Sequence, residues 1–433
     1  MKNISKKKIE EYKRQFHTSS MNLYLSNIVS FNQLQKLNNV SKQNSHYNPI
    51  YNIKVEPQVK SLDQKKSGLC WLYSCLNIIR PKMCQKYNLE NFEFSTKYLL
   101  FWHKFENFNF ILQKMIDLKT EEPNSRLFQY FVKRGLPDSG QWNSFVNLVL
   151  KYGLVPETSF KDSVHRCKTE ELNDILHLKL LNFTKKIRSV ENPEKLQPVF
   201  MKEIFQILCI FLGVPPNKIN FEYEDKKKKY YKVKNITPLE FFKKHVPIKL
   251  NDYVVLMNDP RKKNPYNRKY QKKYTTNMTH QKGLEYLNVP MTRMKTITLE
   301  SLKSNESVWF GADTHQFLNK EICSFDIQAV GALKFLNISM DLDKEDRIEY
   351  NYSDIFHAMV ITGANVDKKK VSYWQIINSW NNKEASEGYY NMSDKWFEEY
   401  GFEIVVLKKF LNANEKKILR TPPIIIEEPW DPL

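Results

Sequence analysis

The first half of the chain carries apolar residues at the spacing of helices. After Ser95, which can cap a helix, apolar side chains recur at positions 101, 105, 108, 112 and 115. A second apolar helix is predicted over 199–212, ending at Gly213. A third is predicted from Thr237-Pro238-Leu239-Glu240, a capping box with proline at the first helical position. We expect a mainly helical lobe over 61–295, preceded by an arm over 1–60 that is partly helical and docks on the body.

Beyond about residue 296 the pattern changes to short β-branched and aromatic runs separated by turn residues. Strands are predicted near 308–310, 358–362, 371–377, 388–391 and 402–407. A helical part followed by a strand-rich part is typical of an α+β protein, here with two lobes and a cleft between them. The β-rich lobe is expected over 296–412. The C-terminal arm, 413–433, contains Pro422-Pro423 and Pro432, so we expect it to be extended rather than helical or an inner strand.

Composition excludes several classes of protein. Of the 433 residues 41% are hydrophobic, with 27 Phe, 23 Tyr and 8 Trp, which excludes a disordered chain. The longest apolar stretch, 204–214, is interrupted by Gln206 and is shorter than the about 20 residues of a membrane span. Six cysteines are too few for a disulfide scaffold, and no apolar run of a secretory signal follows the first lysines. We predict a cytoplasmic protein without membrane contact.

The chain is strongly basic, with 67 Lys and Arg against 48 Asp and Glu and a net charge of +19. Two clusters, Lys226–Lys229 and Arg261–Lys273, have tyrosines interleaved with the cations. This combination suits the backbone and bases of nucleic acid. Solvated lysine-rich loops explain the same pattern. Charge therefore suggests a nucleic-acid partner without establishing one.

One segment combines a thiol with the start of a helix. Ser67 and Gly68 precede Cys70, and the apolar stretch 71–79 that follows ends before Pro81. Cys70 is thus expected at the first turn, where unpaired N–H groups and the helix dipole lower a thiol pKa. A lone cysteine is more often an inert buried residue, so this signal needs partners.

Two partners are found late in the chain. His357 begins a predicted strand and is followed by the small Ala358, while Asn378 ends the next strand. An antiparallel pair of strands would bring Asn378 beside His357, where its oxygen could orient the imidazole. Each residue also has an ordinary explanation, as a hydrogen-bonded core histidine and a turn asparagine.

The order Gln64, Cys70-Trp71, His357-Ala358 and Asn378-Ser379-Trp380 resembles the papain-like cysteine peptidases. The resemblance implies a papain-like α+β fold of two lobes. It also implies that Cys70 is the nucleophile, His357 the base and acid, Asn378 its orienting group and Gln64 an oxyanion-hole donor. Trp380 would shield the histidine–asparagine hydrogen bond from water.

The spacing from Cys70 to His357 is 287 residues, against roughly 130–150 in papain-type enzymes, so a large insertion is expected. The bleomycin hydrolase branch carries such an insertion. This chain also resembles that branch at three motifs, namely Gly140-Gln141-Trp142, Asn258-Asp259-Pro260-Arg261 and the terminal Trp430-Asp431-Pro432. The resemblance implies trimming of peptides from the amino end, a homohexameric barrel, and no metal or organic cofactor.

Three features depart from that branch. Leu69 replaces the usual arginine before the nucleophile, Ser139 replaces the first glycine of the pair that binds the substrate backbone, and the C-terminal arm is shorter. Ser139, Gly140, Trp380 and Leu433 are the residues expected around the substrate. An endopeptidase is one alternative, which holds if the shorter arm does not reach the cleft. A nucleic-acid-binding or scaffolding protein on a peptidase fold is the other.

Overall fold

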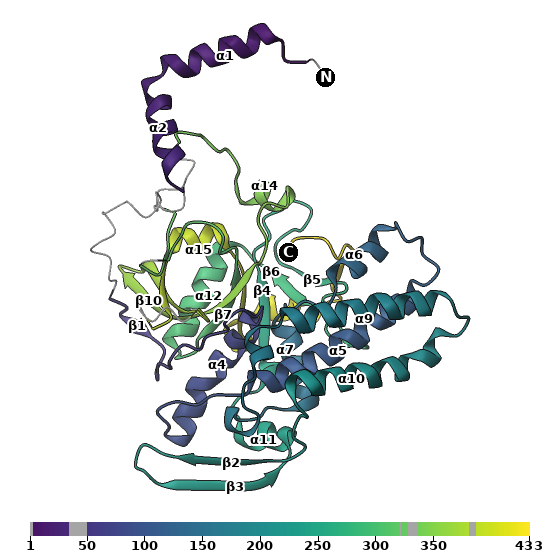
Figure 1. Ribbon diagram of the computed structural model, residues 1–433. Helices are drawn as coiled ribbons and strands as arrows, with labels where there is room; N and C mark the ends of the chain where they lie inside the picture. The colour runs from purple at the N-terminus through teal and green to yellow at the C-terminus, as the bar shows by residue number, and fades with distance from the viewer. Residues whose placement is uncertain (1–2, 34–49, 321, 328–335, 381–386) are drawn as a thin grey trace.

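The computed structural model describes residues 3–33, 50–320, 322–327, 336–380 and 387–433 of the chain (Figure 1). A group of helices that includes α5, α7, α9 and α10 lies beside a large sheet. The helices are α1 (Lys6–Thr18), α2 (Ser20–Phe31), α4 (Cys70–Tyr87), α5 (Thr96–Asp117), α6 (Arg126–Arg134), α7 (Trp142–Tyr152), α8 (Val164–Cys167), α9 (Glu170–Arg188), α10 (Gln197–Leu212), α11 (Pro238–His245), α12 (Met291–Lys303), α14 (Lys344–Glu349), α15 (Asp394–Tyr400) and α16 (Ala413–Ile418).

The sheet follows the order β14-β5-β6-β4-β13-β7-β10-β11-β12-β9-β8, with β1 paired to β10. Its strands are β1 (Ile53–Lys54), β4 (Tyr253–Met257), β5 (Arg268–Lys272), β6 (Glu285–Asn288), β7 (Val308–Ala312), β8 (Leu318–Asn319), β9 (Ser324–Phe325), β10 (His357–Asp367), β11 (Lys370–Ile377), β12 (Tyr389–Ser393), β13 (Gly401–Leu407) and β14 (Ile424–Ile426). A separate hairpin, β2 (Ile219–Glu224) and β3 (Tyr230–Ile236), projects from the helical side (Figure 1). Strands from both sides of residue 296 thus share one sheet.

Alternate residues of each strand are buried on opposite faces of the sheet. In β7, Trp309 packs with the helical lobe, while Val308 and Phe310 pack with α12 and α15 on the other face. This alternation is the two-residue period of a strand. Because both faces are covered, the central strands β4 and β7 are buried along their whole length and read as continuous apolar runs. The predicted α+β class is confirmed.

Most predicted elements form where the sequence places them. Ser95 caps α5, Gly213 follows α10, and Thr237 and Glu240 form the capping box of α11. One boundary is wrong, because α4 continues through Pro81 to Tyr87. Proline removes only one helical hydrogen bond, and burial of the apolar residues on both sides of it stabilises the longer helix.

Both terminal arms differ from expectation. The N-terminal arm is helical in α1 and α2, but neither helix has a buried residue and both project from the body (Figure 1). The C-terminal arm is not wholly extended, since α16 forms behind a capping box of Asn412 and Glu415. The two prolines at 422–423 follow α16 and precede β14, which joins the sheet as an edge strand beside β5.

Candidate active site

Cys70 is the first residue of α4, as predicted, and is partly exposed. Hydrogen bonds from residues before and after Cys70 fix the turn in which it lies. The N–H of Gly68 donates to Asp138 Oδ2 at 2.9 Å, and Trp71 Nε1 donates to the carbonyl oxygen of Asp138 at 2.8 Å. Leu69 is fully buried, so the residue that departs from the usual arginine contributes to the core. The thiol therefore stands on a turn fixed to the helical lobe.

Asp138 is the centre of this attachment. Its carboxylate also accepts hydrogen bonds from Thr169 Oγ1 and from Asn173 Nδ2, and it lies 2.7 Å from the ammonium of Lys104, which is fully buried. Burial alone would raise the pKa of Asp138, but Lys104 and these donors hold it well below the usual range. The carboxylate is therefore charged at neutral pH and connects α4, α5 and α9 to the nucleophile turn.

His357 and Asn378 meet as the antiparallel pairing of β10 with β11 predicts. His357 Nε2 lies 2.7 Å from Asn378 Oδ1, which also accepts the N–H of Ser379 at 2.7 Å. An amide oxygen only accepts, so Nε2 carries the proton and Nδ1 is left as the basic nitrogen. The ring of Trp380 stacks on the imidazole with centroids 4.3 Å apart. Trp380 thus covers His357 rather than lining the cavity.

Gln64 is buried beside the same strand end. Its Nε2 donates to the carbonyl oxygen of Ser67 at 2.6 Å, and its Oε1 accepts from Ser379 Oγ at 2.5 Å. Its backbone N–H donates to the carbonyl oxygen of Ser379 at 2.9 Å. Gln64 therefore links the nucleophile turn to the Asn378 turn and does not itself line the cavity.

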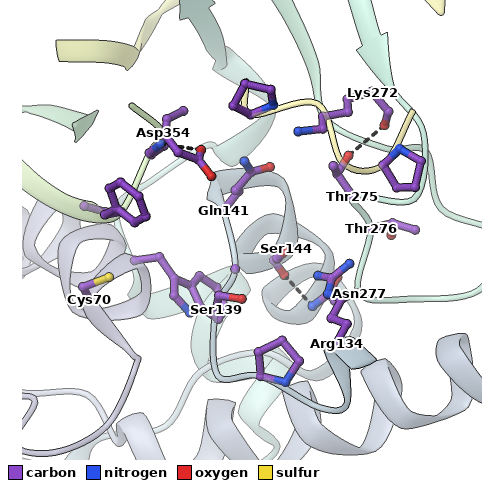
Figure 2. A pocket seen from close by; sticks show the side chains of 18 of the residues that line it. Cys70, Arg134, Ser139, Gln141, Ser144, Lys272, Thr275, Thr276, Asn277 and Asp354 are labelled. Atoms are coloured by element: carbon purple, nitrogen blue, oxygen red, sulfur yellow. Dashed lines mark hydrogen bonds between the residues drawn. The ribbon is translucent and has the colours of Figure 1, made fainter. Parts of the chain in front are cut away.

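Cys70 and His357 line one cavity of about 710 Å³ between the two lobes. Ser139 (Figure 2) and Gly140, the two residues of the predicted substrate-binding pair, lie in its wall. A Cβ at Gly140 would lie 2.6 Å from Trp71, so no larger residue fits without displacing that ring. Ser139 is exposed in the cavity wall, whereas Gly140 is half-buried.

Burial changes the pKa of both central residues. It raises the pKa of the Cys70 thiol, which is opposite to the lowering predicted from the helix N-terminus, although a hydrogen bond from the backbone of Ala358 acts in the lowering direction. Burial also lowers the pKa of His357 to about 4, and the Asn378 hydrogen bond only partly offsets this. Before substrate binds, each group alone is uncharged at neutral pH.

The C-terminal arm reaches the cavity despite its shorter length. Pro429, Trp430, Asp431 and Pro432 form part of its wall, while Leu433 does not line it and is buried at 2% exposure. The carboxylate of Asp431 holds the segment in place by pairing with the buried Arg261 at 2.8 Å. The sequence contained this contact only as two separate motifs, Asn258–Arg261 and Trp430-Asp431-Pro432.

The two basic clusters have different environments. Lys226–Lys229 form the exposed turn between β2 and β3. In the second cluster most cations are already paired, namely Arg261 with Asp259 and Asp431, Lys263 with Asp431, Lys269 with Glu285, and Lys273 with Glu427. In the first cluster Lys228 pairs with Glu224 at 3.2 Å, but all four lysines are exposed, so this cluster is the more accessible of the two to a polyanion such as nucleic acid.

Within the described residues, His, Cys, Asp and Glu side chains form no group of three or more that could hold a metal ion. Among the same residues no helix is long and apolar enough to cross a membrane.

The chain is similar to known proteins over most of its length. The sequence model of the Peptidase C1-like family matches residues 3–433. The chain is 36% identical to bleomycin hydrolase of Mus musculus over 386 residues, which cover 86% of this chain and 85% of the relative. It is 33% identical to aminopeptidase C of Streptococcus thermophilus over 417 residues, covering 94% and 93%.

The chain belongs to the Peptidase C1-like family. Its structure also matches the crystal structure of PepW from Lactobacillus rhamnosis HN001 with a TM-score of 0.95 and 28% identity, covering 100% of this chain and 98% of the other. The predicted bleomycin hydrolase branch and papain-like fold are therefore confirmed, and the chain is a cysteine-type peptidase of this family.

Proposed function

We propose that this chain hydrolyses peptide bonds from the amino end of peptides, with Cys70 as nucleophile and His357 as base and acid. The observation that carries the proposal is the 2.7 Å contact of His357 Nε2 with Asn378 Oδ1, which leaves Nδ1 as the proton acceptor in the cavity that holds Cys70. The relatives named aminopeptidase C and bleomycin hydrolase support the same activity.

The reaction begins with proton transfer from the Cys70 thiol to His357 Nδ1. The thiolate attacks the carbonyl carbon and forms a C–S bond. His357 then gives the proton to the leaving amine as the C–N bond breaks. Burial disfavours each isolated charge, but the thiolate and imidazolium form together, and their attraction is stronger at a buried site than in water. Water activated by His357 hydrolyses the thioester in the second half of the reaction.

The negative oxygen of the tetrahedral intermediate needs donors that are already in place. The N–H of Cys70 is one of the first of α4, which lack helical partners. Gln64 lies behind the cavity wall in the free chain, where its Nε2 uses one hydrogen on Ser67, and the proposal requires its other hydrogen to reach this oxygen beside Cys70. Both of its amide atoms are fixed by hydrogen bonds, so Gln64 pays little entropy to act.

Cleavage of one peptide in two forms, with a free and with an acetylated amino terminus, tests the direction of trimming. Because residues 429–432 close one side of the cavity, we expect cleavage of the free peptide alone, with single residues released in order. Mass spectrometry of the products over time measures this. Internal cuts in both forms would establish the endopeptidase alternative instead. If neither form is cut while oligonucleotides bind in a salt-dependent way, the scaffolding alternative replaces the proposal.

We also propose that copies of the chain assemble, as the homohexamer of the branch implies. Apolar side chains of α1 and α2 are exposed on the isolated chain, among them Tyr24 at 71% and Phe31 at 87%. Such a surface is normally covered by a partner. Light scattering in physiological salt is expected to give a mass near six times 51.7 kDa. A monomeric mass would contradict the assembly.

A further inference from the structure

Asp354 is an acidic residue of the cavity that the reaction described above does not use. It lies in the segment between α14 and β10, three residues before His357, and lines the same cavity as Cys70. Its Oδ1 accepts the N–H of Ile355 at 2.5 Å. In Figure 2 its carboxyl group points into the cavity. Asp354 is therefore fixed at one oxygen and open to the cavity at the other.

The charge of Asp354 is not neutralised by a neighbouring cation. Across the described ranges no lysine or arginine nitrogen lies within 4.0 Å of its carboxylate. Lys272, which faces the same cavity, donates its ammonium to the carbonyl oxygen of Asp431 instead. A carboxylate on the wall of a substrate cavity without an ion-pair partner is suited to a cation that the substrate brings.

The surroundings limit what can enter. The wall formed by residues 429–432, held by Asp431 on Arg261, closes the cavity on the side of Asp354 and Lys272. A long peptide substrate cannot extend past this wall, but the end of a peptide fits against it. The cationic group at the end of a peptide is its α-ammonium, which can donate an N–H to the carboxylate oxygen of Asp354 that Ile355 does not use.

We propose that Asp354 binds the free α-ammonium of the peptide substrate. This assignment rests on the proposed aminopeptidase function and names the residue that selects the amino end. Asp354 is a specificity residue, since it contacts the substrate away from the reacting carbonyl. Arg134 and Lys272, the cations in the same cavity wall, are the groups that oppose it.

Peptide binding to an inactive chain tests the proposal without turnover. In a Cys70→Ala background, calorimetry would compare a pentapeptide with a free and with an acetylated amino terminus. We expect the free form to bind about tenfold or more tightly, as for a hydrogen bond to a charged group. Adding Asp354→Asn is expected to bring this ratio near one. Asparagine keeps the oxygen that accepts from Ile355, so the turn is preserved.

The matched control is Glu349→Gln. Glu349 is exposed at the end of α14 and outside the cavity wall, so its loss changes the net charge equally without touching the site. The ratio is expected to stay at about tenfold. Asp354→Glu, which restores the charge, is expected to recover part of the preference.

Three results would overturn the assignment. The first is a ratio unchanged by Asp354→Asn, and the second is an equal loss in Glu349→Gln. The third is that Asp354→Asn weakens the binding only of acetylated peptides that carry lysine. Asp354 would then bind basic side chains and not the α-ammonium. The aminopeptidase proposal fails separately, if the unmodified chain cleaves neither form of the peptide.

Discussion

Replacing Cys70 by alanine is expected to lower kcat/KM for peptide cleavage by about 10⁴-fold or more while the fold stays intact. The substitution removes the only thiol that lines the cavity together with His357. Without it no thioester forms, and the remaining rate comes from binding and the oxyanion donors. Steady-state kinetics on a free-amine peptide measures the loss, and circular dichroism checks the fold.

The matched control is Cys75→Ala, on the same helix. Cys75 is fully buried, and burial raises its pKa well above the usual value, so it remains a neutral thiol inside the core. Its removal is expected to cost about 1 kcal/mol of stability and to leave kcat/KM within about twofold. Substantial peptidase activity in Cys70→Ala, or equal losses in the two variants, would exclude Cys70 as the nucleophile.

Replacing Asp138 by alanine is expected to lower the free energy of unfolding by about 3–5 kcal/mol. The change leaves the ammonium of Lys104 buried without its counter-ion and removes the acceptor of the Gly68 N–H. Since the folded pKa of Asp138 lies below its unfolded value near 3.8, the contribution is full above that pH and disappears only in stronger acid. Urea unfolding at pH 7 measures it.

Two comparisons separate the buried pair from an ordinary loss of charge. Asp117→Ala breaks the exposed pair with Lys114 and is expected to cost less than about 1 kcal/mol. Replacing Lys104 by methionine together with Asp138→Asn removes both buried charges, and should recover part of the stability that Asp138→Ala loses. Equal stability of the Asp138→Ala and Asp117→Ala variants would contradict the role of Asp138 as the anchor of the nucleophile turn.

Much of the site was predictable because it is encoded locally. Cys70 begins a helix because Ser67 and Gly68 precede an apolar run, and His357 meets Asn378 because adjacent antiparallel strands bring a strand start beside the neighbouring strand end. The capping residues of α5 and α11 are local for the same reason. Each of these predictions depends only on residues close in the sequence or on one pair of adjacent strands.

The missed features depend on contacts between distant segments. Asp138, Lys104 and Thr169 come together only after three helices pack, and no local pattern marks any of them. Asp354 is a single acid in an irregular segment, and its position in the cavity depends on how β10 enters the sheet. The direction of the Cys70 pKa was wrong because helix position is visible in the sequence while burial is not. Tertiary environment decides all three.

The division of the site between the two lobes has a consequence for biosynthesis. The nucleophile belongs to α4, but the imidazole and its amide partner stand on β10 and after β11, and β11 pairs with β12, which is made later still. A ribosome must therefore add at least 378 of the 433 residues before a reactive pair can exist. The growing polypeptide carries its thiol early. It nevertheless has no peptidase activity toward its own free ends or toward neighbouring proteins until synthesis is nearly complete.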